Sequence, residues 1–276
     1  MAISGAAASP NMGYHSSPAI TFIMTFFNAR LGWWLGNPGV AGGRTFRHSQ
    51  PTLAVRPLIS EALGLTDDRN PYVYLSDGGH FENLGLYEMV LRRCRHIVVV
   101  DAGQDHECRF EDLGNALRKI RIDLGISIQL AKMPIWAEVP EGETGRYCAV
   151  GRILYGQVDG PEAENGWLLY IKPAVYGSEP QDVQHYKALM KAFPHESTGD
   201  QWFSEQQFES YRALGLHAVD TICAAAGEDG IGGLPDLFKV ARWYLGEEVE
   251  EPAALELCEE PAPVSGPVAA PSIHAA

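Results

Sequence analysis

One stretch, residues 72–101, constrains the fold of this chain more than any other. It reads YVYLSDGGHFENLGLYEMVLRRCRHIVVVD, and its first four residues form an apolar run that predicts a strand. The glycines Gly78 and Gly79 then permit backbone angles that other residues avoid. Helical spacing of apolar residues from Phe81 to Leu91 predicts a helix, and the arginines that follow suit the negative end of its dipole. The apolar run 97–100 is typical of a strand buried on both faces.

The order strand, turn, helix, strand predicts an α/β fold, a layered sheet flanked by helices. Because crossovers of this kind nearly always return parallel, we expect strands 72–75 and 97–100 to lie side by side and parallel. Asp77 would then stand at the carboxyl end of the first strand, the edge of open α/β sheets where functional residues collect. The simpler interpretation of Asp77 is a turn residue that caps the next helix.

Periodicity predicts further elements along the chain. Strands 147–155 and 167–172 flank an acidic loop and are expected to pair with each other. Ser204 and Gln207 form a capping-box pattern at a helix start. The other predicted elements are helices over 52–65, 111–124, 182–193, 204–226 and 234–245, and a strand over 126–130.

The segment around Asp77 resembles a known family. Asp77-Gly78-Gly79, followed by Asn83 and a helix into IVVVD, is similar to the second catalytic motif of patatin-like phospholipases and to the corresponding segment of the cytosolic phospholipase A2 catalytic domain. Residues 2–10 resemble the small-residue segment upstream of that motif. Residues 193–215 resemble the end of bacterial members. Together these segments cover most of residues 1–220.

The resemblance implies a patatin-like acyl hydrolase fold and the hydrolysis of lipid esters by a serine–aspartate dyad, as in phospholipases and lysophospholipases. In such a dyad the serine attacks the ester carbonyl and the aspartate takes its proton. The resemblance implies that Asp77 is this base and that Gly78 and Gly79 allow close backbone approach. Asn83 either holds the Asp77 loop or faces solvent on the first helical turn. A carboxylate is a weak base, so we expect an apolar environment that raises the pKa of Asp77. The flanking apolar residues are Tyr74, Leu75 and Phe81.

The nucleophile of that dyad is missing from the sequence. No Gly-x-Ser-x-Gly elbow occurs, and the pattern around Ser4 has alanines where the elbow needs glycines. We therefore expect residues 1–246 to be the C-terminal portion of a patatin-like domain, incomplete at the N-terminus. Its partner would be the missing N-terminal half, and the chain on its own would be inactive, which leaves its status as an enzyme open.

Several residues are candidates for lipid contact. Residues 19–27, AITFIMTFF, are the most hydrophobic stretch, too short to span a membrane. They predict either a core helix or an interfacial helix that meets acyl chains. The substrate would be a phospholipid or another acyl ester at a membrane surface. The candidate contacts are Phe22, Phe26, Trp33 and Trp34 for acyl chains, and Arg92 and Arg93 for head groups or simply for a helix end.

Charge and cysteine usage exclude some classes of protein. Much of the net charge of −14 comes from the acidic, Pro/Ala-rich tail 247–276, which is expected to be disordered. The body is only mildly acidic, which argues against non-specific nucleic-acid binding. Five scattered cysteines without a Cys-x-x-Cys predict reduced thiols in a cytoplasmic protein. The lipid substrate that the resemblance implies would make it a peripheral membrane protein. We expect neither a metal nor a cofactor.

Two other classes of function remain open. One is a non-catalytic lipid- or partner-binding module with an exposed apolar cleft. The other is a metal-dependent hydrolase, although neighbouring loop residues rarely converge on one ion, and the loop 102–108 is expected to be solvated. His80 has no role in the dyad. The candidate metal ligands are Asp77, His80, Asp101, Asp105 and His106.

Overall fold

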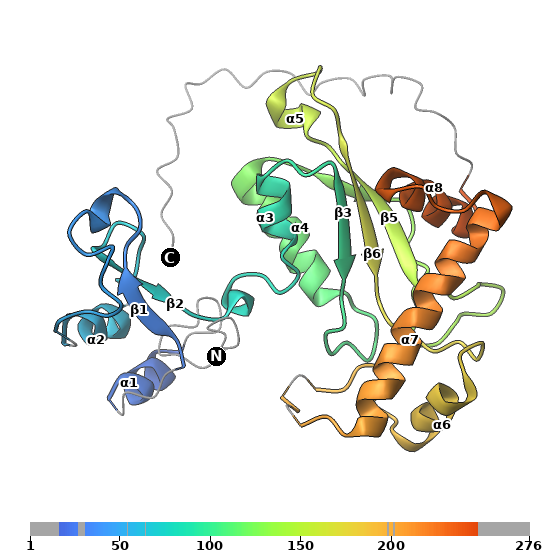
Figure 1. Cartoon of the computed structure of the whole chain (residues 1–276), viewed down its shortest axis with the longest axis horizontal. Helices are drawn as coiled ribbons and strands as arrows, with labels where there is room; N and C mark the ends of the chain where they lie inside the picture. The colour runs from blue at the N-terminus through green and yellow to red at the C-terminus, as the bar shows by residue number, and fades with distance from the viewer. Residues whose placement is uncertain are drawn as a thin grey trace. The chain divides into compact units, whose positions relative to one another are not determined.

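The computed structural model describes residues 17–26, 31–53, 55–63, 65–197, 199–200 and 202–247 (Figure 1). The chain divides into two compact units at the Asn83–Leu84 junction. The described residues up to Asn83 are called the N-terminal unit, and those from Leu84 the C-terminal unit. The predictions for residues 2–10, and for the tail beyond Glu247, lie outside the described residues.

The N-terminal unit is built on a two-stranded antiparallel sheet in which Trp33 lies opposite Leu75. Trp34 points inward from the first strand, where its Nε1 donates to Glu61 Oε1 at 2.6 Å and its ring packs on Tyr74. These contacts hold a helix against the sheet. The elements are α1 (Pro18–Phe26), β1 (Trp33–Gly36), η3 (Val40–Gly42), α2 (Val55–Ala62), β2 (Tyr72–Leu75) and the 3-10 helix η4 (Gly78–His80).

The C-terminal unit contains a four-stranded mixed sheet in the order β3-β6-β5-β4. β3 is parallel to β6, and the other neighbours are antiparallel. The elements are α3 (Leu86–Leu91), β3 (His96–Val100), α4 (Glu111–Leu124), β4 (Ile128–Leu130), β5 (Cys148–Ile153), α5 (Gly156–Asp159), β6 (Gly166–Ile171), α6 (Gln181–Leu189), α7 (Glu205–Cys223), η5 (Ala224–Asp229) and α8 (Leu234–Tyr244).

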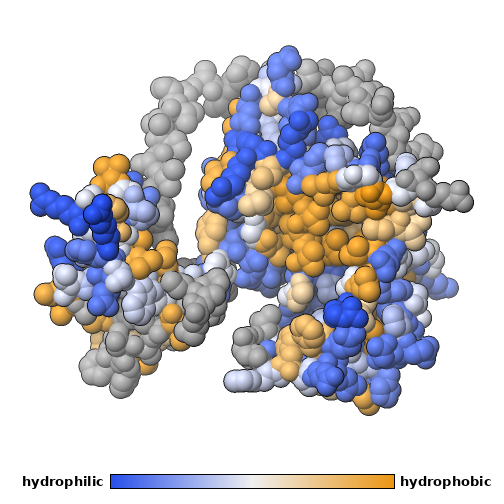
Figure 2. Space-filling model, viewed as in Figure 1, coloured by the Kyte–Doolittle hydropathy of each residue, from blue (hydrophilic) through white to orange (hydrophobic). Residues whose placement is uncertain are grey.

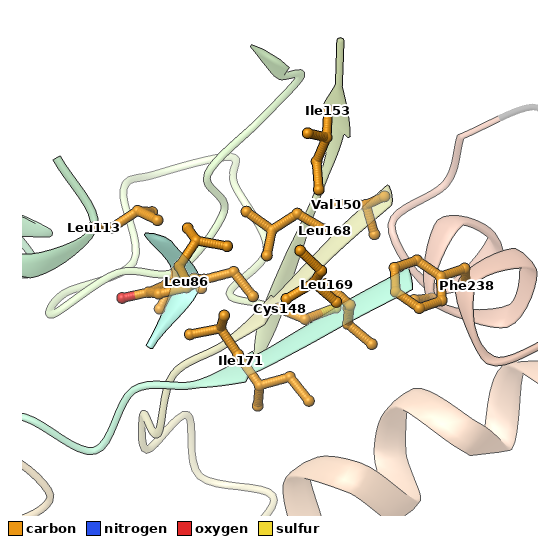
Figure 3. Close-up of a cluster of buried hydrophobic side chains, with 14 of the residues drawn as sticks. Leu86, Leu113, Cys148, Val150, Ile153, Leu168, Leu169, Ile171 and Phe238 are labelled. Atoms are coloured by element: carbon orange, nitrogen blue, oxygen red, sulfur yellow. The ribbon is translucent and has the colours of Figure 1, made fainter. Parts of the chain in front are cut away.

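Helices cover both faces of this sheet, as the sequence predicts for an α/β fold. In Figure 3, Leu86 of α3 and Leu113 of α4 lie on one side of the strands, and Phe238 of α8 lies on the other. All three are buried. A smaller cluster joins α6 to α7 and consists of Val183, Tyr186, Phe193 and Leu214. The general α/β architecture is therefore confirmed.

The prediction that strands 72–75 and 97–100 lie side by side is wrong. β2 pairs with β1 in one sheet, and β3 pairs with β6 in another. The crossover rule fixes the direction of two strands that share a sheet, but it does not decide whether they share one. β6 is a longer and almost fully buried strand, so it is the better partner for β3.

Two local predictions in the same stretch also need correction. The helix begins at Leu86 rather than near Phe81, because Gly85 adopts a left-handed conformation (φ 69°) immediately before it. β3 is not buried on both faces by the described residues. Ile97 and Val99 are buried, whereas Val98 is 39% and Val100 is 67% exposed. The strand therefore alternates, as expected at the edge of a sheet.

Other predictions are confirmed. The strands predicted over 147–155 and 167–172 are β5 and β6, which pair antiparallel, and the helix predicted over 111–124 is α4. Ser204 caps α7, since its Oγ accepts from Gln207 N at 3.1 Å. The Gln207 side chain, however, donates to Glu196 and Asp200 instead of completing the capping box.

Replacing Ser204 by Ala is expected to lower the free energy of unfolding by about 1 kcal/mol, because one N–H at the start of α7 loses its acceptor. Urea unfolding followed by far-UV circular dichroism measures this change. Ser204→Asp keeps an acceptor at the same position and should remain close to the native protein. An equal loss in both variants would show that the cap is not the cause.

Candidate functional site

The turn after β2 holds Asp77 in a defined position. Asp77 is the N-cap of η4, with extended backbone angles (φ −64°, ψ 134°). Its Oδ1 accepts from Gly79 N at 2.6 Å, so one carboxylate oxygen is fixed by the backbone. The capping role that the sequence allowed for Asp77 is therefore present, and it orients the carboxylate at the end of the strand.

The structure brings Asp77, Gly79 and Asn83 together. A Cβ added at Gly79 would clash with Asn83 Oδ1 and would lie 2.8 Å from Asp77 Oδ1. Both side chains thus fold over the Gly79 Cα, and a larger residue there would displace them. Gly78 is different, because a Cβ at this exposed position would meet nothing within 4 Å.

The apolar residues around Asp77 do not enclose it within the described part of the chain. Tyr74 is half-buried against Trp34. Leu75 is 39% and Phe81 is 46% exposed. The apolar enclosure expected around the carboxylate is therefore not formed by the residues that the structure describes, although the apolar side chains are present beside it.

A pocket of about 280 Å³ lies beside this turn in the N-terminal unit. Ser76 and His80, one on each side of Asp77 in sequence, contribute to its wall, and Ser76 Oγ lies 3.0 Å from His80 Nδ1. Asp77 is not part of the lining. The pocket is lined by Thr66, Asp67, Asp68, Val73, Tyr74, Ser76 and His80.

The candidate acyl-chain contacts separate into two groups. Phe22 and Trp33 are exposed and can meet a partner or a lipid. Trp34 is buried and hydrogen-bonded to Glu61, which gives it a place in the core. The side chain of Phe26 lies outside the described residues.

Both candidate head-group residues make ion pairs within the C-terminal unit. Arg92 pairs with Glu88 one helical turn away, with Nη2 2.7 Å from Oε1. Arg93 binds both carboxylate oxygens of Asp159, at 2.6 and 3.0 Å. This hydrogen bonding raises the pKa of Arg93 further above its usual value. These contacts favour the structural interpretation of both arginines.

Sequence reasoning missed a buried charged cluster where β3 and β6 end. Because the two strands are parallel, Asp101 and Lys172, which follow them, meet at the same edge. Asp101 Oδ2 accepts from Tyr170 Oη at 2.5 Å and from Lys172 Nζ at 3.0 Å, and its Oδ1 accepts from Gly103 N. Only 1% of the Lys172 side chain and 3% of that of Asp101 are exposed. Burial and the Asp101 hydrogen bond raise the pKa of Tyr170.

The loop that follows Asp101 is only partly solvated. Asp105 turns inward, with Oδ2 3.7 Å from Lys172 Nζ, and its carboxylate accepts from the N–H groups of Arg109 and Phe110. His106 remains exposed. The signal that could have identified this cluster is a charged residue directly after each of two apolar strands.

His195 lies against this cluster and is buried. Its ring is 6.1 Å from that of His106, and its Nδ1 has no hydrogen-bond partner among the residues that the structure describes. Burial, followed by repulsion from Lys172, lowers the pKa of His195 from 6.5 to about 4, although a hydrogen bond with the Gly103 backbone opposes the shift. His195 is therefore neutral at neutral pH.

The C-terminal unit is expected to lose stability as the pH falls from about 6.5 to about 4. In this window the unfolded chain binds a proton at His195 that the native protein does not, so stability rises with pH. The difference in pKa corresponds to roughly 3 kcal/mol. Urea unfolding at pH 7 and pH 4.5 measures most of this loss, which is complete only below the folded-state pKa. His195→Gln should flatten this dependence, whereas His106→Gln, at an exposed position, should retain it.

The arrangement of these residues does not form a metal site. Among the described positions, no group of three or more His, Cys, Asp or Glu residues could hold an ion. The Lys172 ammonium contacts both Asp101 and Asp105, two of the candidate ligands, and therefore already supplies a positive charge that balances them.

None of the helices in the described ranges is long and apolar enough to cross a membrane.

No family model, no curated protein and no solved structure matches this chain. The resemblance of the Asp77 segment to patatin-like phospholipases therefore depends on the sequence motifs themselves.

Proposed function

We propose that this chain carries the general base of a lipid acyl hydrolase of the patatin-like phospholipase type, and that the base is Asp77. The observation that carries the proposal is the geometry of the turn. The Asp77 carboxylate stands at the end of β2 with Oδ1 fixed by Gly79 N, and Asn83 packs over the same glycine. Oδ2 is the oxygen that accepts the proton in this proposal.

The reaction proceeds through an acyl-enzyme. A serine on a nucleophile elbow attacks the ester carbonyl, and Asp77 takes its proton and returns it to the leaving alcohol. Water then hydrolyses the acyl-serine, with Asp77 again accepting a proton. Because the sequence contains no Gly-x-Ser-x-Gly, this proposal requires an elbow on another segment, which the resemblance assigns to the N-terminal half of the domain.

The exposed apolar residues beside Asp77 support this division of the site. Leu75 and Phe81 are the kind of surface that a partner segment covers. Covering them would exclude water from the carboxylate, which is what a carboxylate base requires. Exposed Phe22 and Trp33 are suited to contact acyl chains of a phospholipid, or another acyl ester, at a membrane surface.

Reconstitution tests the proposal. The chain is fused to, or mixed with, the segment encoded immediately upstream of residue 1, where a Gly-x-Ser-x-Gly is expected. Release of fatty acid from phosphatidylcholine vesicles is then measured. We expect release only when both parts are present and only with the elbow serine intact. Equal release by the upstream segment alone would contradict a catalytic role for this chain.

A second candidate function is a non-catalytic binding module. Figure 2 shows a hydrophobic surface over the strands of the C-terminal unit. In the same unit, the side chains of Val98 and Val100 on the edge strand β3 are exposed. An apolar edge strand is a site for partner binding unless it is protected. Saturable binding to vesicles, unchanged by Asp77→Asn and without hydrolysis in the reconstituted protein, would favour this function.

A further inference from the structure

We infer that the N-terminal unit carries a second nucleophile–base pair, Ser76 and His80, which acts on short-chain acyl esters in the pocket beside the turn. This activity goes beyond the serine–aspartate dyad, for which the chain on its own lacks the nucleophile. Both residues of the pair belong to the part of the chain that the structure describes.

The geometry of the pair fits proton transfer. Ser76 Oγ and His80 Nδ1 are 3.0 Å apart, within the range for a serine activated by a histidine. Both residues are half-buried and both line the same pocket of about 280 Å³. A substrate in this pocket would therefore meet the nucleophile and the base together.

The turn between the two residues fixes their separation. Asp77 Oδ1 accepts from Gly79 N at 2.6 Å, and Phe81 N and Glu82 N both donate to Gly78 O at 2.9 Å. Hydrogen bonds thus close the turn from Asp77 to Glu82, directly after Ser76. The Ser76–His80 contact is therefore preorganised rather than formed on binding, which is the condition for efficient general-base catalysis.

A second serine–histidine contact shows that a short distance between the two side chains is not sufficient to identify a nucleophile–base pair. Ser178 Oγ lies 3.1 Å from His217 Nε2 in the C-terminal unit. That hydroxyl also lies 3.4 Å from Tyr147 Oη, which competes for it, and neither residue lines the pocket beside the turn. The combination of contact and pocket distinguishes Ser76, and Ser178 provides a matched control.

The pocket indicates the class of substrate. Its volume of about 280 Å³ is below the usual range for drug-sized ligands and is too small for a long acyl chain. Asp67 and Asp68 line the wall, and Asp67 is held in place by Arg69 N and Asn70 Nδ2. Two carboxylates disfavour anionic ligands. The substrates are therefore neutral or cationic esters of short acids.

The chemical step balances without a further reactant besides water. Ser76 Oγ forms a bond to the ester carbonyl carbon while its proton passes to His80 Nδ1. The carbon–oxygen bond to the alcohol breaks, and the alcohol leaves with that proton. Water then attacks the acyl-serine, gives a proton to His80, and releases the acid as Ser76 recovers its hydrogen. No oxidation or reduction takes place.

Active-site labelling tests the inference on the full chain. The chain is incubated with a small dialkyl fluorophosphate, and the modified serine is identified by peptide mass spectrometry. We expect the label on Ser76, and a rate of labelling about a hundredfold lower in His80→Gln, since a general base contributes at least this factor. Ser178→Ala and His217→Gln should label at the native rate, and p-nitrophenyl acetate should be hydrolysed faster than p-nitrophenyl palmitate.

Two results would overturn the inference: a label on another serine or on none, and a rate that His80→Gln leaves unchanged. Ser76→Cys keeps a nucleophile in place, and its alkylation by iodoacetamide should likewise be slowed by His80→Gln. Circular dichroism confirms that each variant is folded. Labelling of Ser76 requires no elbow serine, so its failure leaves the proposal for Asp77 standing, and the failure of reconstitution leaves the inference for Ser76 standing.

Discussion

If Asp77 is the general base proposed here, replacing it by Asn in the reconstituted protein is expected to lower kcat for phospholipid by about a hundredfold or more, the contribution of a general base. An amide cannot accept the serine proton at this position. The amide oxygen of the substituted side chain can still accept from Gly79 N, as Asp77 Oδ1 does, so the turn keeps its conformation. Because the change is nearly isosteric, the loss should fall on kcat rather than on the thermal stability of the chain.

Two controls make this result specific. Asp220→Asn makes the same chemical change at an exposed position on α7, and His106→Ala removes an exposed histidine. Both should retain most of the activity. Fatty-acid release from phosphatidylcholine vesicles, measured at saturating lipid, gives kcat for each variant. A reconstituted enzyme that is indifferent to Asp77→Asn would exclude the serine–aspartate dyad.

Replacing Lys172 by Met should destabilise the C-terminal unit by about 3–5 kcal/mol. The change leaves the Asp101 carboxylate buried without its ammonium partner, and only the Tyr170 hydroxyl and the Gly103 N–H remain, among the described residues, to compensate it. An unpaired charge in the interior cannot recover the hydration that it has lost. Urea unfolding measures the change in the free energy of unfolding.

A matched substitution tests whether burial is the cause. Lys239→Met removes an ion pair with Asp236 that is largely exposed, and it should cost less than about 1 kcal/mol. The double variant Lys172→Met/Asp101→Asn removes both charges and should be more stable than Lys172→Met alone. If the loss of unfolding free energy in the double variant equals the sum of the losses in Lys172→Met and Asp101→Asn, the two residues are not coupled.

Features encoded by neighbouring residues could be predicted from the sequence. The bounds of α4 follow from its apolar spacing, and the cap at Asp77 depends on residues within one turn. The pairing of β5 with β6 was also predictable, because only a short acidic loop separates them. Each of these three features depends on interactions between residues that are close in the sequence, so the spacing of apolar and polar residues predicts it.

Features that depend on distant pairing could not be predicted. Asp101 and Lys172 are 71 residues apart, and they meet only because β3 pairs with β6 rather than with β2. Which of the two strands pairs with β3 depends on how much apolar surface each pairing buries. His195 is similar, since no local pattern separates it from the exposed His106, and its burial depends on where the loop after α6 packs.

The pairing of β3 with β6 also has a consequence for the synthesis of the chain. Val100 and Ile171 pair at the carboxyl end of the two strands, although Ile171 is translated long after Val100. At ribosomal rates of about 5–20 residues per second, this delay lasts roughly 4 to 14 seconds. During it, β3 is an apolar strand whose partner has not yet emerged. We therefore expect the nascent chain to be prone to aggregation at the unpaired edge of β3 until β6 leaves the ribosome.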